Sequence, residues 1–342
     1  MPETLTEDFG PLVVAWQQHQ GRNELPWQNT RDPYRVWLSE IMLQQTQVTT
    51  VLGYYERFLQ RFPTVAELAA ASLDEVLALW AGLGYYSRAR NLHACARAVV
   101  ELHGGRFPPS AQGLQTLPGI GRSTAAAIAA FCYQERVAIL DGNVKRVLSR
   151  VLAFDGDLAS SASERRLWDL ATALLPEQGV DRYTQGLMDL GATVCTQRSP
   201  QCLLCPVQSL CRGSASGDPT RFPVKTRKLK RGRRENWWLW LERQRDGRRE
   251  LLLCQRPAQG VWAGLWTLPM FDDEPAARAA VGGAELQPLA RIEHALTHFD
   301  WVLHTASAQV GEGSVPPGQW VARETLAHYA LPAPLKKLIE ES

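Results

Sequence analysis

Four of the seven cysteines in this 342-residue chain are grouped between residues 195 and 211. They follow the pattern Cys-x6-Cys-x2-Cys-x5-Cys, at Cys195, Cys202, Cys205 and Cys211. In a reducing compartment such a group indicates a metal site rather than disulfides. Four thiolates suit either a tetrahedral zinc ion or an iron–sulfur cluster. Structural zinc sites usually contain two close pairs, and the single close pair here favours iron–sulfur. The fold must therefore bring these four side chains together.

Composition and chain ends restrict the class of protein less strongly. The formal net charge is only +2, so any basic surface must come from local clustering of Lys and Arg. No apolar run approaches the ~20 residues that span a bilayer. The N-terminus carries Glu3, Glu7 and Asp8 where a secretory signal carries basic residues. We therefore expect a cytoplasmic protein with no membrane segment and no targeting signal.

The pattern of apolar residues divides the chain into two domains joined by a linker. Residues 1–212 show helical spacing with turns marked by Gly and Pro, which predicts a helical domain containing the cysteine loop 195–211. Residues 213–234 predict an exposed basic linker, because eight of its last fourteen residues are Lys or Arg. Residues 235–342 predict a smaller α+β domain, with strands near 237–241, 250–254 and 301–308 and a closing helix from Pro334.

Residues 37–55 fit a single amphipathic helix. At helical spacing, Glu40, Gln44 and Gln47 share one face, and a second face is apolar, formed by Trp37, Ile41, Val48, Leu52 and Tyr55. A solvated helix face is the ordinary explanation of such a polar stripe. The stripe gains a functional meaning only from the other motifs of the chain.

Two further segments are candidates for chemistry. Residues 117–125, Leu-Pro-Gly-Ile-Gly-Arg-Ser-Thr-Ala, form a tight glycine turn before a helix of small residues, as in a helix–hairpin–helix. Free N–H groups at such a helix start can bind a phosphate, although many glycine turns bind nothing. Asp141 precedes the next helical segment, where an Asp is usually only an N-cap. The helix dipole favours its ionised form. A buried, protonated Glu40 beside it would give the acid and the anion that cleavage of an N-glycosidic bond requires.

Six motifs in the same order resemble the MutY-type adenine DNA glycosylases of the helix–hairpin–helix, endonuclease III-like superfamily. They are LPW (25–27), WLSEIMLQQTQV (37–48), GLGYYSRARNL (82–92), LPGIGRSTA (117–125), ILDGNVKRV (139–147) and the cysteine loop. The resemblance covers nearly the whole chain. It implies a mostly α glycosylase domain with a four-iron, four-sulfur cluster, followed by a smaller Nudix-like α+β domain.

The resemblance also implies a substrate and residue roles. The expected substrate is an adenine mispaired with 8-oxoguanine or guanine in double-stranded DNA, flipped out of the helix and excised by a monomeric enzyme. Glu40 matches the general acid that protonates adenine N7, Asp141 the carboxylate that stabilises the oxocarbenium-like sugar, and Asn143 a residue that orients the site. The matching DNA and lesion contacts are Gln44, Gln45, Thr46, Leu83, Tyr85, Gly119, Gly121, Ser123, Thr297 and His298.

Two positions refine what the resemblance implies. Endonuclease III relatives carry at position 123 a lysine that forms a Schiff base with the sugar, and Ser123 cannot do so. We therefore expect a glycosylase without true lyase activity. Residues 260–269 match the glycine/tryptophan loop of the Nudix-like domain, whose Glu-rich metal box is missing. The family's Phe-Ser-His recognition motif reads Leu296-Thr297-His298 here. A non-catalytic DNA-binding or redox-sensing iron–sulfur protein on the same scaffold is the rival hypothesis.

Overall fold

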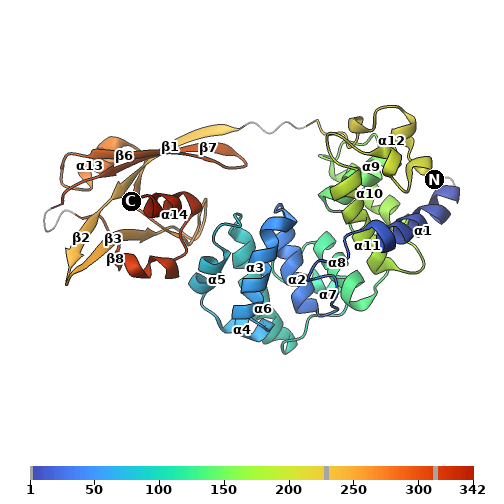
Figure 1. Cartoon of the computed structure of the whole chain (residues 1–342), viewed down its shortest axis with the longest axis horizontal. Helices are drawn as coiled ribbons and strands as arrows, with labels where there is room; N and C mark the ends of the chain where they lie inside the picture. The colour runs from blue at the N-terminus through green and yellow to red at the C-terminus, as the bar shows by residue number, and fades with distance from the viewer. Residues whose placement is uncertain (1–2, 227–230, 311–314) are drawn as a thin grey trace. The chain divides into compact units, whose positions relative to one another are not determined.

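The structure is a computed structural model that describes residues 3–226, 231–310 and 315–342 (Figure 1). The chain forms two compact units. The first contains Met1–Ala69 and Ala94–Lys228, and the second contains Ala70–His93 and Leu229–Ser342. The short helical segment 70–93 is thus grouped with the C-terminal part of the chain. No helix in the described part of the chain is long and apolar enough to cross a membrane.

The first unit is built almost entirely of helices, as the sequence predicts. Its main α-helices are α1 (Glu3–Gln20), α2 (Pro33–Leu43), α3 (Val48–Arg61), α4 (Val65–Ala70), α6 (Ser87–His103), α7 (Ala111–Leu114), α8 (Arg122–Tyr133), α9 (Gly142–Val151), α10 (Ser161–Ala173) and α11 (Val180–Asp189). Two of these helices extend into the second unit: α4 at Ala70, and α6 in its part before Ala94. A π-helical turn, Leu190–Val194, extends α11 to the first clustered cysteine. Short turns then follow at Cys202–Leu204, Gln208–Leu210, α12 (Arg212–Ala215) and Pro219–Arg221.

Helix α9 shows how the sequence produces this core. Asp141 caps its start by accepting a hydrogen bond from the Val144 N–H at 2.7 Å. Val144, Val147 and Val151 then fall on one face and are at most 2% exposed. Burying each such side chain contributes roughly 1.5–3 kcal/mol. This face packs into a core shared with α1, α8, α10 and α11, so the segment after Asp141 is held on several sides.

The expected single helix over residues 37–55 is wrong. Helix α2 ends at Leu43, and α3 begins at Val48. Between them Gln45 adopts a left-handed backbone with φ of 56°, which an α-helix cannot accommodate. Glu40 therefore lies on α2 whereas Gln47 is the N-cap residue before α3, so the two share no stripe. Leu52, expected on the apolar face, is 37% exposed.

The second unit contains the helix α5 (Leu73–Trp80) and two four-stranded sheets, which confirms the smaller α+β domain. One sheet has the order β5-β1-β7-β6, and in the other β3 pairs with β2, β4 and β8. The strands are β1 (Gly232–Trp240), β2 (Glu242–Arg245), β3 (Arg248–Gln255), β4 (Trp266–Thr267), β5 (Met270–Phe271), β6 (Gln287–Ala295), β7 (Phe299–Ser307) and β8 (Gln319–Ala322). Two α-helices complete it, α13 (Glu274–Ala279) and α14 (Ala333–Glu340), with a 3₁₀ turn at Arg323–His328.

The segment expected to be a linker, residues 213–234, is partly folded. Gly213 is buried within α12, where an added Cβ would lie 2.6 Å from the Arg150 carbonyl oxygen. The Leu158 N–H donates to the Val224 carbonyl, which ties this stretch to the helical unit. Strand β1 already begins at Gly232, because its first residues pair in parallel with β7. Residues 227–230 of the expected linker lie outside the described residues.

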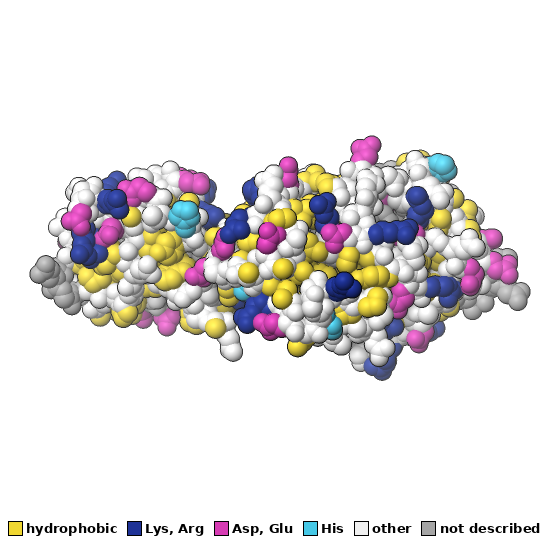
Figure 2. Space-filling view, turned by 90° about the horizontal axis from the view of Figure 1, so that it is seen from below, with side chains coloured by type: hydrophobic (Ala, Val, Ile, Leu, Met, Phe, Trp, Pro, Cys, Tyr) yellow, Lys and Arg dark blue, Asp and Glu magenta, His cyan; other side chains and the backbone are white. Residues whose placement is uncertain are grey.

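Charge on the molecular surface is mixed. Figure 2 shows Lys and Arg side chains interspersed with Asp and Glu over the face in view. This agrees with the formal net charge of +2.

Candidate active site and cysteine site

Glu40 lies on the last turn of α2 and lines a cavity of about 450 Å³ in the first unit. The cavity wall comes from several separate segments: α1, the stretch 23–31, α2, α8 and α11. Its other lining residues are Gln17, Asn23, Trp27, Gln28, Asn29, Thr30, Arg31, Val36, Ser39, Phe131, Asp181, Arg182 and Gln185. None of these residues is predicted from the sequence as a site residue. Only Trp27, within the LPW motif, carried a signal that could have found one.

The orientation of Gln185 in this cavity is fixed by a buried partner. Its amide Nε2 donates to the carboxylate of Asp189 at 2.8 Å. Asp189 is fully buried, and Arg22 also binds it through its backbone N–H at 2.9 Å and its Nε at 2.7 Å. Because the amide nitrogen is engaged with Asp189, the Gln185 side chain has its carbonyl oxygen left to accept a hydrogen bond.

The environment of Glu40 favours its protonated form. Burial, and then the charge of the nearby Asp141, raise the pKa of Glu40 from 4.5 to about 8. The side chain keeps partial access to the cavity although protein surrounds it. A carboxyl group with this pKa holds its proton at neutral pH and can donate it as a general acid.

Asp141 is the N-cap of α9, as predicted. Burial raises its pKa, and this effect opposes the lowering expected from the helix start alone. Backbone hydrogen bonds from Val144 and Asn143 and the charges of Arg146 and Lys145 act in the opposite direction. All of these stabilise the anion, whereas both influences on Glu40 favour the neutral form. Of the two interacting carboxyl groups, Asp141 is therefore the one suited to carry the negative charge.

Asn143, the second residue of α9, is held by Arg146. The Arg146 Nη2 donates to Asn143 Oδ1 at 2.8 Å and to the Gly191 carbonyl at 2.7 Å, while its Nε donates to the Cys195 carbonyl at 2.8 Å. Gly191 is required here, since an added Cβ would lie 2.6 Å from the Asn143 Cβ. One guanidinium thus connects the segment of Asp141 and Asn143 to the backbone of the first clustered cysteine.

The glycine turn before α8 has the geometry expected of an anion-binding helix start. Gly119 has φ of 75°, a left-handed conformation that favours glycine. Gly121 is the N-cap of α8, and no described side chain caps this helix. An added Cβ at Gly121 would meet nothing within 4 Å, so ligand can approach the first N–H groups of the helix.

Ser123 on α8 and the segment 44–46 after α2 are both held by hydrogen bonds near the start of α8. Ser123 Oγ accepts a hydrogen bond at 3.1 Å from the backbone N–H of Leu140, the residue before Asp141. Gln44 donates through Nε2 to Thr124 Oγ1 at 3.4 Å, which ties the end of α2 to α8. Gln45 holds the left-handed turn, and the Thr46 N–H donates to the Leu43 carbonyl at 3.2 Å. Ser123 thus supports the backbone that carries the candidate anion.

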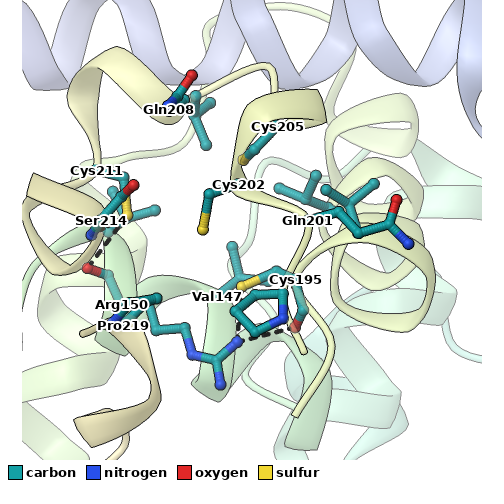
Figure 3. Close-up of a pocket in the computed structure, with 15 residues that line it drawn as sticks. Val147, Arg150, Cys195, Gln201, Cys202, Cys205, Gln208, Cys211, Ser214 and Pro219 are labelled. Carbon is teal, nitrogen blue, oxygen red and sulfur yellow. Dashed lines mark hydrogen bonds between the residues drawn. The ribbon is translucent and has the colours of Figure 1, made fainter. Parts of the chain in front are cut away.

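The four clustered cysteines line one cavity, as predicted from their spacing (Figure 3). Val147, Arg150, Leu190 and Val194 complete much of its wall. In Figure 3 the sulfur of Cys202 points into the space enclosed by the other three cysteines. Among the described residues no group of three or more His, Cys, Asp or Glu is arranged to hold a metal ion. Four thiolates lining one cavity are the donor set of a four-iron, four-sulfur cluster, which Cys195, Cys202, Cys205 and Cys211 would hold.

The candidate lesion-contacting residues of the second unit include a direct contact. Tyr85 and Thr297 share a hydrogen bond of 2.9 Å between their hydroxyl groups, although 212 positions separate them in the sequence. Tyr85 has φ of 47° and is 44% exposed. Thr297 and His298 are exposed in the β6–β7 turn. Leu83 differs from this group because it is buried, at 5% exposure.

The glycine/tryptophan loop, residues 260–269, packs inside the second unit. Trp262 is 6% exposed and stacks on Trp301 with ring centroids 4.6 Å apart. The next residue, Ala263, accepts a hydrogen bond from Arg90 Nη1 at 2.9 Å through its carbonyl. This loop therefore connects the C-terminal sheets to the segment 70–93, which explains why that segment belongs to the second unit.

Comparison with known proteins agrees with both halves of this architecture. Residues 38–172 match the HhH-GPD superfamily of base excision DNA repair proteins, and residues 238–341 match the NUDIX domain family. In solved structures the chain resembles a thermostable thymine-DNA glycosylase (TM-score 0.56, 27% identity), covering 62% of this chain and 98% of that one. A non-covalent endonuclease III–DNA complex (TM-score 0.52, 20% identity) shares the fold over 61% of this chain and 95% of that one.

Curated relatives extend over nearly the whole chain. The adenine DNA glycosylase of Homo sapiens is 36% identical over 96% of this chain and 73% of its own length. The adenine DNA glycosylase of Buchnera aphidicola subsp. Acyrthosiphon pisum is 31% identical over 97% of both chains. With the helical fold, the Nudix-like domain and the motif order in agreement, the chain belongs to the MutY-type adenine DNA glycosylases of base excision repair.

Proposed function

We propose that this enzyme hydrolyses the N-glycosidic bond of adenine mispaired with 8-oxoguanine or guanine in duplex DNA. The observation that carries the proposal is the pairing of Glu40, whose pKa is raised to about 8, with the N-capping Asp141. One carboxyl group is held neutral and the other is surrounded by groups that favour its anion. A protein that only bound DNA would gain nothing from burying such a pair.

The reaction follows from this division of roles. The adenine flips out of the duplex, because a pocket can enclose the base and reach its glycosidic bond only when the nucleotide is outside the stack. Glu40 donates its proton to N7, which turns the base into a better leaving group. Asp141 stabilises the oxocarbenium-like sugar as the bond breaks, and water completes the hydrolysis. Asn143, fixed by Arg146, orients the Asp141 segment.

The cavity next to Glu40 is the proposed adenine pocket. Its volume of about 450 Å³ is within the range of small-molecule sites. Gln185 faces it with an amide whose nitrogen is engaged by Asp189. The free carbonyl oxygen is suited to accept a hydrogen bond from an exocyclic amine, which adenine has and hypoxanthine lacks.

We further propose that the product is an abasic site without strand scission. Ser123 stands where lyase relatives carry lysine, and its Oγ is engaged by the Leu140 N–H. A hydroxyl cannot form the Schiff base that β-elimination requires. The N–H groups after Gly121 would bind a DNA phosphate, with Gln44, Gln45 and Thr46 in the neighbouring DNA contact.

The proposed cofactor is a four-iron, four-sulfur cluster held by Cys195, Cys202, Cys205 and Cys211. It would supply a rigid link between the end of α11 and the turns that follow it, and no step of the reaction uses it. The second unit is the proposed lesion reader, with the exposed Tyr85, Thr297 and His298 as its contacts; Leu83, expected from the sequence to join them, is buried. We propose that the enzyme acts as a monomer in the cytoplasm.

One assay tests the central proposal. Purified protein is incubated, in excess, with duplexes that contain adenine opposite 8-oxoguanine, guanine or thymine. We expect excision from the first two, with strand breaks only after alkali or heat. Glu40→Gln, which keeps the shape but cannot donate the proton, should bind the same duplexes without excision. Binding by the wild type with no excision from any duplex would instead support the rival, a non-catalytic DNA-binding protein.

A further inference from the structure

Arg150 is a buried cation beside the cysteine cavity. It lies at the end of α9, is 2% exposed and is among the largest fully buried side chains of the chain. Its side chain lines the same cavity as the four cysteines (Figure 3). Within the described parts of the chain it forms no salt bridge with a carboxylate.

The hydrogen bonds of Arg150 all go to neutral backbone oxygens and to one cysteine sulfur. Nη1 donates to the Thr196 carbonyl at 2.7 Å and to Cys195, at 3.3 Å to its carbonyl and 3.4 Å to its Sγ. Nη2 donates to the Gln197 carbonyl at 2.9 Å, and Nε to the Phe222 carbonyl at 3.1 Å. These bonds give each nitrogen of the guanidinium an acceptor but do not neutralise its charge.

A buried guanidinium without a counter-charge is costly, so the position of Arg150 requires an anion nearby. Four thiolates carry more negative charge than the core of the cluster returns, so the loaded site is a net anion. The Cys195 Sγ, which faces the Arg150 Nη1, would be part of it. Arg146 adds a second guanidinium four residues earlier on the same helix, but its hydrogen bond to Cys195 goes to the carbonyl oxygen and not to the sulfur.

We propose that Arg150 is the counter-ion of the cysteine-bound cluster, and that its charge stabilises the more reduced oxidation level of that cluster. The inference rests on the proposed iron–sulfur cofactor. It assigns Arg150 a positioning and electrostatic role, because the guanidinium both fixes residues 195–197 and places its charge against a ligand sulfur. A cation near a redox centre favours the more negative state. Removing the charge should therefore lower the reduction potential.

Two variants separate charge from scaffolding. Arg150→Gln removes the cation, whereas Arg150→Lys keeps it and loses the planar fork that reaches several carbonyls. Arg136→Gln is the control for loss of an arginine that also bonds backbone carbonyls. Arg136 donates to the carbonyls of Leu175 and Pro176, but it is exposed, pairs with Glu177 at 3.3 Å and has no described contact with a cysteine. Iron per chain, the visible absorbance of the cluster and the midpoint potential of its one-electron couple are measured on each anaerobically purified full-length protein.

We expect Arg150→Gln to retain less iron and, in the loaded fraction, to shift the equilibrium between the two oxidation levels about tenfold toward the oxidised one. For a one-electron couple this corresponds to a potential lower by about 59 mV. Arg150→Lys should keep the wild-type potential, and Arg136→Gln should change neither quantity. A loaded Arg150→Gln protein with wild-type potential would overturn the inference, as would equal shifts in both Arg150 variants. Should Arg150→Gln not fold, the Arg150→Lys protein alone tests the inference, and a potential that differs from the wild-type value would overturn it. Wild-type protein with zinc and no iron would refute the cofactor itself, while excision would still test the proposed function.

Discussion

The rate of adenine excision should depend on the protonation of Glu40. Burial and the charge of Asp141 raise the pKa of this group from 4.5 to about 8. Below pH 8 the acid is loaded with its proton, and the single-turnover rate should change little from pH 6.5 to 7.5. Above pH 8 the protonated fraction falls tenfold for each pH unit, and the rate should fall with it. A Glu40 with an ordinary pKa would be almost fully ionised at pH 7.

The same shift has a consequence for stability. A carboxyl group whose pKa is higher in the folded protein binds its proton more tightly there, so its contribution is fully present below pH 4.5 and lost as pH rises toward 8. Each unit corresponds to about 1.36 kcal/mol, so a shift from 4.5 to about 8 corresponds to about 5 kcal/mol at most. At pH 7 roughly 3 kcal/mol of that is already lost. Glu40→Gln, which does not titrate, should therefore be more stable than the wild type, and more so at pH 9 than at pH 6.

The assay compares wild type and Glu40→Gln from pH 6 to 9.5. Excision of adenine opposite 8-oxoguanine is followed with enzyme in excess, so that product release does not set the rate. Thermal midpoints of both proteins are recorded over the same range, with Glu56→Gln, an exposed carboxyl on α3, as the control. A wild-type rate that stays level to pH 9.5, or a Gln variant that retains near-native excision, would refute Glu40 as the acid. A stability difference independent of pH would refute the raised pKa.

Four further changes test other parts of the site. Asp141→Asn should reduce single-turnover excision by ~10²–10⁴-fold, a loss comparable to that of the acid, because an amide cannot offset a developing cation; wild-type rates would contradict the pairing. Gly191→Ala should lower the thermal midpoint and slow excision, since its Cβ would lie 2.6 Å from that of Asn143 and such overpacking costs about 1–3 kcal/mol; an unchanged midpoint and rate would argue against this close contact. Cys202→Ser should lose most of the iron in a metal analysis, and full iron content would remove this residue from the ligand set. Thr297→Val breaks the hydrogen bond with Tyr85 and should reduce the preference for 8-oxoguanine over guanine while leaving excision opposite guanine intact; equal loss on both duplexes would indicate a general structural effect.

Several features of this protein could be predicted from the sequence because they depend on local chemistry. The helical first part and the α+β second part follow from apolar periodicity, which acts within each element. Asp141 as an N-cap follows from one side chain at the start of an apolar repeat, and the cysteine spacing alone predicts one shared site. The order of the six sequence motifs indicated the family. The prediction of a single helix over residues 37–55 was wrong because the apolar spacing continues through Gln45. The left-handed backbone of Gln45 does not alter that spacing, so the sequence pattern does not reveal the break.

Only the tertiary structure decided the features that depend on groups distant in sequence. The pKa of Glu40 depends on burial and on Asp141, about one hundred residues away, and neither is written in the local sequence. The cavity wall takes Gln17 and Gln185 from different helices. Tyr85 meets Thr297 because the segment 70–93 packs with the C-terminal sheets. The sequence does not distinguish Arg150 from other helical arginines, and only the fold shows that it is buried against Cys195. Electrostatic effects, burial and hydrogen bonding depend on neighbours in space. The sequence can therefore indicate candidate residues, whereas only the fold determines their protonation, burial and hydrogen-bond partners.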